Sequence, residues 1–264
     1  MKTLMAVVFS ILLVGQTGTH VLAQRPGPRD GRALFEQLGL TPGQRAKLRE
    51  LLRANRMESE RARRALGQER TRLFATYDDY QLNVSRARQS IVKMNRLRLD
   101  LLNASLHRQI ALRTVLTADQ FAQMKRIMRH GPFDRERLGK GPGPGHGFGP
   151  RRPPQLDLRS DQRDAVEKFW KSHDKNVGET GRAMAHDLAA INRLYENHRL
   201  DERAAKRLIS SVNQAQAREA HLRLDWQVEM RKILSEDQFR TLTQHIRKSF
   251  APPRGSWPKP RQPR

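Results

Sequence analysis

The chain has 264 residues, of which 37% are hydrophobic, 30% are charged and only 6% are aromatic. This composition disfavours a strand-rich sandwich and suits long amphipathic helices packed in pairs or small bundles. Lys and Arg number 51 against 27 Asp and Glu, and the net charge of +24 favours anionic partners. Because the chain has no cysteine, disulfides and thiolate metal sites are excluded.

Residues 1–23 have the pattern of a secretory signal peptide. A basic start is followed by a mostly apolar stretch over residues 4–15, and small residues precede an expected cleavage before Gln24. The apolar stretch is shorter than the roughly 20 residues that a spanning helix needs, which argues against a membrane anchor. We therefore predict export to the periplasm, and chromosomal nucleic acid is not expected as a partner.

Helical periodicity first appears after a Pro-, Gly- and Arg-rich segment at residues 24–33, which we expect to be disordered. The first helical unit is expected over residues 34–133. Its apolar spacing predicts helices at 42–76, 83–115 and 118–130. The turn between the first two helices is short and polar, so they should form an antiparallel hairpin.

Two helix starts in this unit carry a capping box. Thr41 stands at the N-cap, Pro42 at the first helical position and Gln44 at the third, so the helix should begin at Pro42. Thr117 and Gln120 repeat the pattern at the third helix. Starting a helix explains these residues fully, so we assign them no catalytic role.

A Gly- and Pro-rich segment at residues 134–154 is expected to be a flexible linker. A second helical unit is expected over residues 155–250, followed by a disordered basic, Pro-rich tail at residues 251–264. The helices predicted in this unit are at 160–196, 201–233 and 236–249.

The two units repeat one pattern at a fixed offset of 118 residues, which we interpret as a tandem duplication. The matching strings are residues 38–44 with 156–162, and 116–121 with 234–239. The second unit departs at Arg159, which replaces the Thr of the first motif, so Ser160 is the expected cap one residue later.

Leu-Thr-x-x-Gln strings that open helices behind a signal peptide resemble the Spy/CpxP family of LTXXQ-motif periplasmic proteins. The motif residues and their degenerate copies are Leu40, Thr41, Gln44, Leu116, Thr117, Gln120, Leu158, Gln162, Leu234, Ser235 and Gln238. The resemblance covers about residues 34–130 and 152–249. It implies an all-α hairpin that dimerises into a curved cradle and acts as an ATP-independent chaperone, an envelope-stress regulator or a zinc-associated or metal-sensing protein.

We therefore predict an all-α protein of two tandem hairpin units that captures unfolded or aggregation-prone envelope proteins without ATP. Arginine suits such a surface, because its stem covers apolar area while its charged head stays hydrated. The candidate client contacts are Arg49, Arg53, Arg56 and Met57. The two units are expected to pair within the chain or in a homodimer. Contact with an anionic membrane surface or another polyanion is a further alternative.

The metal alternative depends on His221 and Asp225, which stand at i, i+4 spacing on one predicted helix. They supply two ligands, and no third follows from the sequence. Weak zinc binding, in a metal-responsive sensor or zinc-resistance protein, is therefore the second hypothesis, and no cofactor is predicted. The chain has no phosphate-binding loop and no nucleophile motif, so we do not expect an enzyme.

Overall fold

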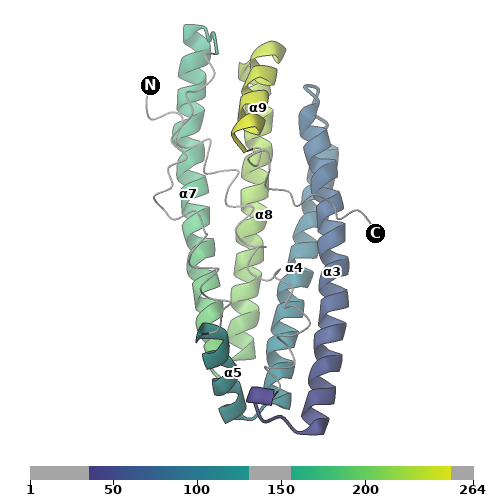
Figure 1. Cartoon of the computed structure of the whole chain (residues 1–264). Helices are drawn as coiled ribbons and strands as arrows, with labels where there is room; N and C mark the ends of the chain where they lie inside the picture. The colour runs from purple at the N-terminus through teal and green to yellow at the C-terminus, as the bar shows by residue number, and fades with distance from the viewer. Residues whose placement is uncertain (1–35, 131–155, 251–264) are drawn as a thin grey trace, which may run out of the picture.

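The computed structural model describes residues 36–130 and 156–250 (Figure 1). The predicted signal peptide, N-terminal segment, linker and tail lie outside these residues, as do positions 34–35 and 131–133 of the first predicted unit and position 155 of the second. The described residues confirm the all-α prediction, with two hairpins of long helices. The helices are α3 (Pro42–Asp78), α4 (Val84–Val115), α5 (Ala118–His130), α7 (Ser160–Glu196), α8 (Glu202–Ile233) and α9 (Glu236–Phe250).

The two hairpins have equal dimensions. Both α3 and α7 have 37 residues, and both α4 and α8 have 32. Each return helix begins one residue later than predicted, because Asn83 and Asp201 are N-caps that accept hydrogen bonds from the N–H groups of Arg86 and Ala204. Among the described helices, none is long and apolar enough to cross a bilayer.

The predicted capping boxes are present at the starts of α3 and α5. The N–H of Gln44 donates to Thr41 Oγ1 over 3.2 Å, and the N–H of Thr41 donates back to Gln44 Oε1 over 3.0 Å. The prediction that Ser160 caps α7 is wrong, because Arg159 is the N-cap. Gln162 fixes this register, since its Oε1 accepts the N–H of Arg159, three residues earlier, over 3.1 Å.

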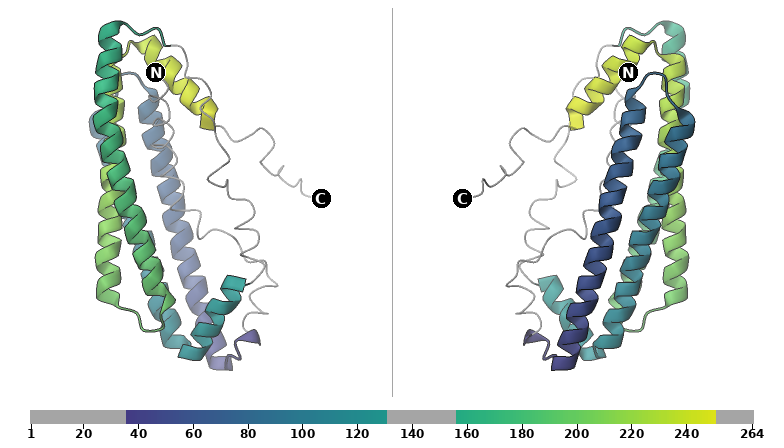
Figure 2. Two further views of the ribbon diagram at one scale, coloured as in Figure 1. Left: turned by 90° about the vertical axis from the view of Figure 1, so that its left-hand side faces the viewer. Right: turned by 90° about the vertical axis from the view of Figure 1, so that its right-hand side faces the viewer.

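The four long helices lie side by side in one layer, in the order α7, α8, α4 and α3 (Figure 1). The contact between the two hairpins is therefore made mainly by the return helices α4 and α8. The short helices α5 and α9 lie at opposite ends of this layer and project from the same side of it (Figure 2). Each end of the layer thus has one short helix on the same side.

Apolar side chains of each hairpin are covered by the other. Ile91 and Met94 of α4 pack in one core cluster with Leu224 of α8. Leu106 of α4 packs in another with Ile209 and other side chains of α7 and α8. Burying one such side chain fully contributes about 1.5–3 kcal/mol, so these two clusters are a substantial part of what holds the hairpins together.

Candidate functional site

The motif glutamines meet where a long helix and a short helix begin. Gln44 Nε2 donates to the carbonyl oxygen of Val115 over 2.8 Å and to Gln120 Oε1 over 2.9 Å. Gln162 makes the equivalent hydrogen bonds to Ile233 and Gln238 in the second hairpin. The motif therefore joins helix starts as well as capping them. The sequence predicts the caps but not this bridge, although two like motifs on either side of an antiparallel hairpin are a signal for it.

A pair of arginines ties each hairpin to the loop of the other. Arg231 of α8 donates to the carbonyl oxygens of Tyr77, Asp79 and Tyr80 over 2.8, 2.7 and 2.9 Å. Its guanidinium also lies over the ring of Phe239, 4.1 Å from the centroid. Burial lowers the pKa of Arg231, which nevertheless stays charged at neutral pH.

Arg113 of α4 makes the reciprocal contacts. It donates to the carbonyl oxygens of Tyr195 and Asn197 in the loop between α7 and α8, both within 3.0 Å. Its guanidinium lies over the ring of Phe121, 4.4 Å from the centroid. The same patch on each hairpin thus contacts the other, as at a twofold interface between subunits. Neither arginine is predicted as a contact residue from the sequence.

The predicted client contacts lie on the outer helix of the first hairpin. Arg49, Arg53, Arg56 and Met57 are all exposed on α3. Arg56 forms an i, i+4 ion pair with Glu60 over 2.8 Å, and both side chains remain largely in solvent. A pair of this kind contributes less than about 1 kcal/mol, so it does not prevent Arg56 from meeting another anion.

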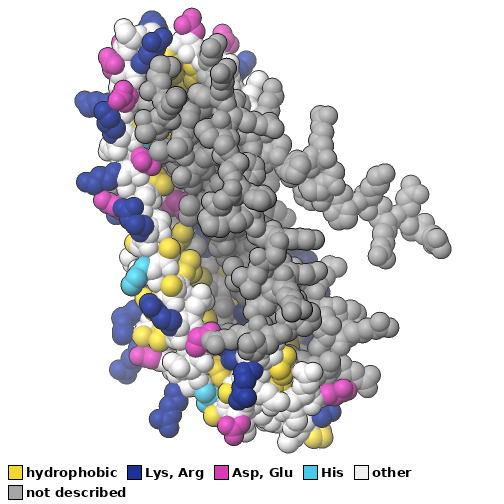
Figure 3. Space-filling view, turned by 60° about the vertical axis from the view of Figure 1, so that its left-hand side comes forward, with side chains coloured by type: hydrophobic (Ala, Val, Ile, Leu, Met, Phe, Trp, Pro, Cys, Tyr) yellow, Lys and Arg dark blue, Asp and Glu magenta, His cyan; other side chains and the backbone are white. Residues whose placement is uncertain are grey.

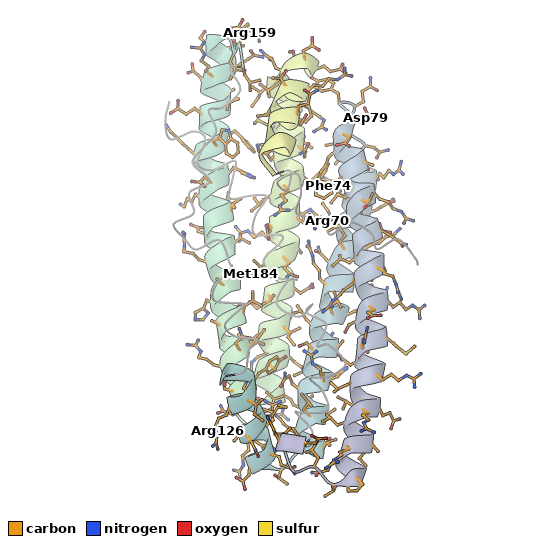
Figure 4. The ribbon with its side chains drawn as sticks, in the orientation of Figure 1. Arg70, Phe74, Asp79, Arg126, Arg159 and Met184 are labelled. Carbon is orange, nitrogen blue, oxygen red and sulfur yellow. The ribbon has the colours of Figure 1, made fainter. Side chains whose placement is uncertain are left out.

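Exposed apolar side chains gather on the same hairpin. Among the described residues, the large hydrophobic side chains left in solvent are Leu52, Met57, Phe74 and Val92, with exposed fractions of 41, 64, 39 and 63%. The first three lie on α3 and the last on α4. The guanidinium of Arg70 lies 5.3 Å from the ring centroid of Phe74, one turn away on the helix (Figure 4). Cationic and apolar groups are therefore adjacent.

The two hairpins differ strongly in charge. Residues 42–115 contain 17 Lys and Arg against 7 Asp and Glu, a net charge of +10. Residues 160–233 contain 14 against 12, a net charge of +2. On the face that brings α7 forward, basic and acidic side chains are interspersed (Figure 3). The positive potential of the described layer is therefore concentrated on the first hairpin.

The metal candidates His221 and Asp225 are both exposed on α8. Within residues 36–130 and 156–250, no group of three or more His, Asp and Glu side chains is placed to hold a metal ion. A nearby histidine, His173 of α7, is only 3% exposed and lies among aromatic rings, stacked on Phe169. Burial lowers the pKa of His173, and the charge of Asp225 opposes this shift.

The family comparison concerns the second half of the chain. Residues 129–241 match the family model for heavy-metal resistance. Within the described residues, the match covers the end of α5, the second hairpin formed by α7 and α8, and the start of α9. The match supports a coarse similarity to heavy-metal-resistance proteins over this part of the chain, whereas the Spy/CpxP assignment and the tandem duplication stay interpretations. No curated protein and no solved structure matches the chain.

Proposed function

We propose that this protein is a periplasmic, ATP-independent chaperone or envelope-stress binding protein of Spy/CpxP type that captures unfolded proteins on its helical surface. The observation that carries the proposal is the exposure of large apolar side chains among arginines on the first hairpin. Met57 is 64% exposed and Val92 is 63% exposed, on a hairpin with a net charge of +10.

The two kinds of side chain have different tasks in this proposal. Charge attracts an oppositely charged chain over a distance of about 8 Å at physiological salt and raises the rate of encounter. Apolar groups then cover hydrophobic segments of the client, at about 25 cal/mol per Å² of buried apolar surface. Neither step consumes chemical energy, and a modest contact area leaves the client free to dissociate and fold.

Light scattering by an aggregating, denatured test protein is the direct experiment. With an acidic test protein, we expect the chain to suppress aggregation at low salt and to do so less well as salt is added. A matched basic test protein of similar size should be protected less. If aggregation is unchanged at equimolar chain and low salt for both proteins, the proposal is wrong.

A second candidate function is metal resistance or metal sensing, which the heavy-metal-resistance match over residues 129–241 favours. His221 and Asp225 are the residues to test, because they share one exposed stretch of α8. Titration calorimetry with Zn²⁺ should show binding heat that is lost in His221→Ala if this candidate holds. Absence of heat at micromolar zinc would remove it.

A further inference from the structure

A row of five residues follows one face of α3 and is here named the α3 stripe. Its members, at successive spacings of 4, 7, 7 and 4 residues, are Leu52, Arg56, Arg63, Arg70 and Phe74. These spacings keep side chains on one side of an α-helix with little angular drift. The stripe therefore has an exposed apolar residue at each end and three arginines between them.

The second hairpin does not carry this row, although its helices have the same lengths. The positions 118 residues later on α7 are Trp170, Asp174, Gly181, Leu188 and Asn192. The three arginines of the stripe are thus replaced on α7 by an acidic residue, a glycine and a leucine. Trp170 is only 7% exposed and packs in the core of its own hairpin. The row is therefore a property of the first hairpin alone.

Arginines of α4 add to the charge beside the stripe. Burial lowers the pKa of Arg108, and the nearby positive charge of Arg63 lowers it further. Burial likewise lowers the pKa of Arg98, to which the charges of Arg223 and Arg70 contribute while Glu219 opposes them. Among the described residues, Arg63 and Arg70 form no ion pair with an acidic side chain. Like charges held close together favour an anion that bridges them.

The length of the stripe indicates what would fit it. Its ends are 22 residues apart on the helix, which corresponds to about 33 Å at 1.5 Å per residue. An extended polypeptide covers that distance with about ten residues. A simple polyanion would satisfy the arginines but would leave Leu52 and Phe74 uncovered. A peptide with acidic residues between two apolar ones complements every member of the stripe.

We propose that the first hairpin alone is the client-binding arm, and that the α3 stripe selects extended, acidic segments flanked by aromatic or aliphatic residues. The second hairpin then serves as the support, held through the α4–α8 contact and the loop contacts of Arg113 and Arg231. This inference rests on the proposed chaperone function and names the client class and the surface within it.

The test compares two variants with equal loss of charge. The stripe variant carries Arg56→Gln, Arg63→Gln and Arg70→Gln. The control carries Lys168→Gln, Lys171→Gln and Lys175→Gln, all exposed on α7. A third variant, Phe74→Asn, introduces the residue that α7 has at the equivalent position, Asn192. Circular dichroism melting verifies that each full-length variant is folded before binding is measured.

The probe is a fluorescent ten-residue peptide with Phe and Leu at its ends and acidic residues between them. We expect the stripe variant to bind it about tenfold more weakly, Phe74→Asn about threefold more weakly, and the α7 control within about twofold of the unchanged protein. A peptide with Lys in place of the acids should not bind. Equal losses of peptide affinity in the stripe and control variants would overturn the proposal that the first hairpin alone binds clients.

Polyphosphate serves as the competing polyanion. If it binds more tightly than the peptide and Phe74→Asn does not affect peptide binding, the surface is a polyanion site and the inference is wrong. The aggregation assay separates this inference from the proposed function. If the unchanged protein, the stripe variant and the control all suppress aggregation equally, the stripe assignment fails and the chaperone proposal stands. If the unchanged protein does not suppress aggregation, the chaperone proposal fails.

Discussion

Gln44 Nε2 donates a hydrogen bond to Gln120 Oε1 over 2.9 Å, so two side chains that cap different helices also bind each other. Gln44 additionally accepts the N–H of Thr41 and donates to the carbonyl oxygen of Val115. One side chain thus satisfies backbone groups at the start of α3 and at the end of α4. The position tolerates few alternatives, because both an acceptor and a donor are used.

Gln44→Ala is expected to destabilise the protein by about 1–3 kcal/mol, since it removes half of a capping box and leaves part-buried polar groups unpaired. Urea unfolding followed by circular dichroism measures this change. Gln68→Ala is the matched control, because Gln68 is an exposed glutamine in the interior of the same helix. Its effect should stay within about 0.5 kcal/mol. Similar destabilisation by both variants would contradict the role given to the motif.

Loss of the hydroxyl group should affect the stability of the protein differently at Tyr80 and at Tyr77. The Tyr80 hydroxyl lies 2.9 Å from the carbonyl oxygen of Leu234, across the hairpin interface. The Tyr77 hydroxyl is buried without a hydrogen-bond partner among the described residues, and burial raises its pKa to about 12. We expect Tyr80→Phe to cost about 1 kcal/mol and Tyr77→Phe to be neutral or slightly stabilising. Thermal unfolding of the two variants checks this, and the reverse order would contradict it.

Local signals in the sequence were sufficient to predict the helices. The Thr41–Gln44 box placed the start of α3, because capping depends on residues three positions apart. Contacts between distant residues were not predictable in the same way. The bonds from Arg113 to a loop more than 80 residues away depend on how two hairpins pack, and nothing in its neighbours marks it among 51 basic residues. Likewise, charge spacing predicts Arg49 and Arg53 as contacts, whereas the exposure of Leu52 and Phe74 depends on how α3 packs.

Arg113→Lys and Arg231→Lys test whether the reciprocal loop contacts hold the hairpins together. Lysine keeps the charge but lacks the planar fork of donors that reaches several carbonyl oxygens at once. Each substitution should cost about 1.5–3 kcal/mol in urea unfolding. In the double variant the two losses of stability should add within about 0.5 kcal/mol, because the substituted residues lie at opposite ends of the layer.

The control for this pair is Arg88→Lys, at an exposed position of α4. This substitution should leave the free energy of unfolding nearly unchanged. Hydrogen exchange adds a second readout, since the loop at residues 79–83 should lose protection in Arg231→Lys and the loop at residues 197–201 in Arg113→Lys. Loss of protection in both loops from either single variant would show that the two contacts are not independent.

His173 is expected to make the protein less stable at mildly acidic pH. Burial lowers its pKa below the usual 6.5, although Asp225 and Asp174 oppose the shift, so the unfolded chain binds a proton there more readily than the folded chain. Stability therefore falls as the pH drops through about 6.5, and continues to fall until the pH reaches the lowered pKa of the folded state. One group of this kind changes the free energy of unfolding by at most about 1.4 kcal/mol per pH unit.

The measurement is urea unfolding at pH 7.5, 6.5 and 5.5 for the unchanged protein and for His173→Asn. Asparagine is the residue at the equivalent position of the first hairpin, Asn55, where it donates to the carbonyl oxygen of Ala104. The variant should lose some stability at every pH because a buried ring is removed, but its stability should fall less between pH 7.5 and 5.5. Parallel curves for the unchanged protein and His173→Asn would show that His173 does not set the response.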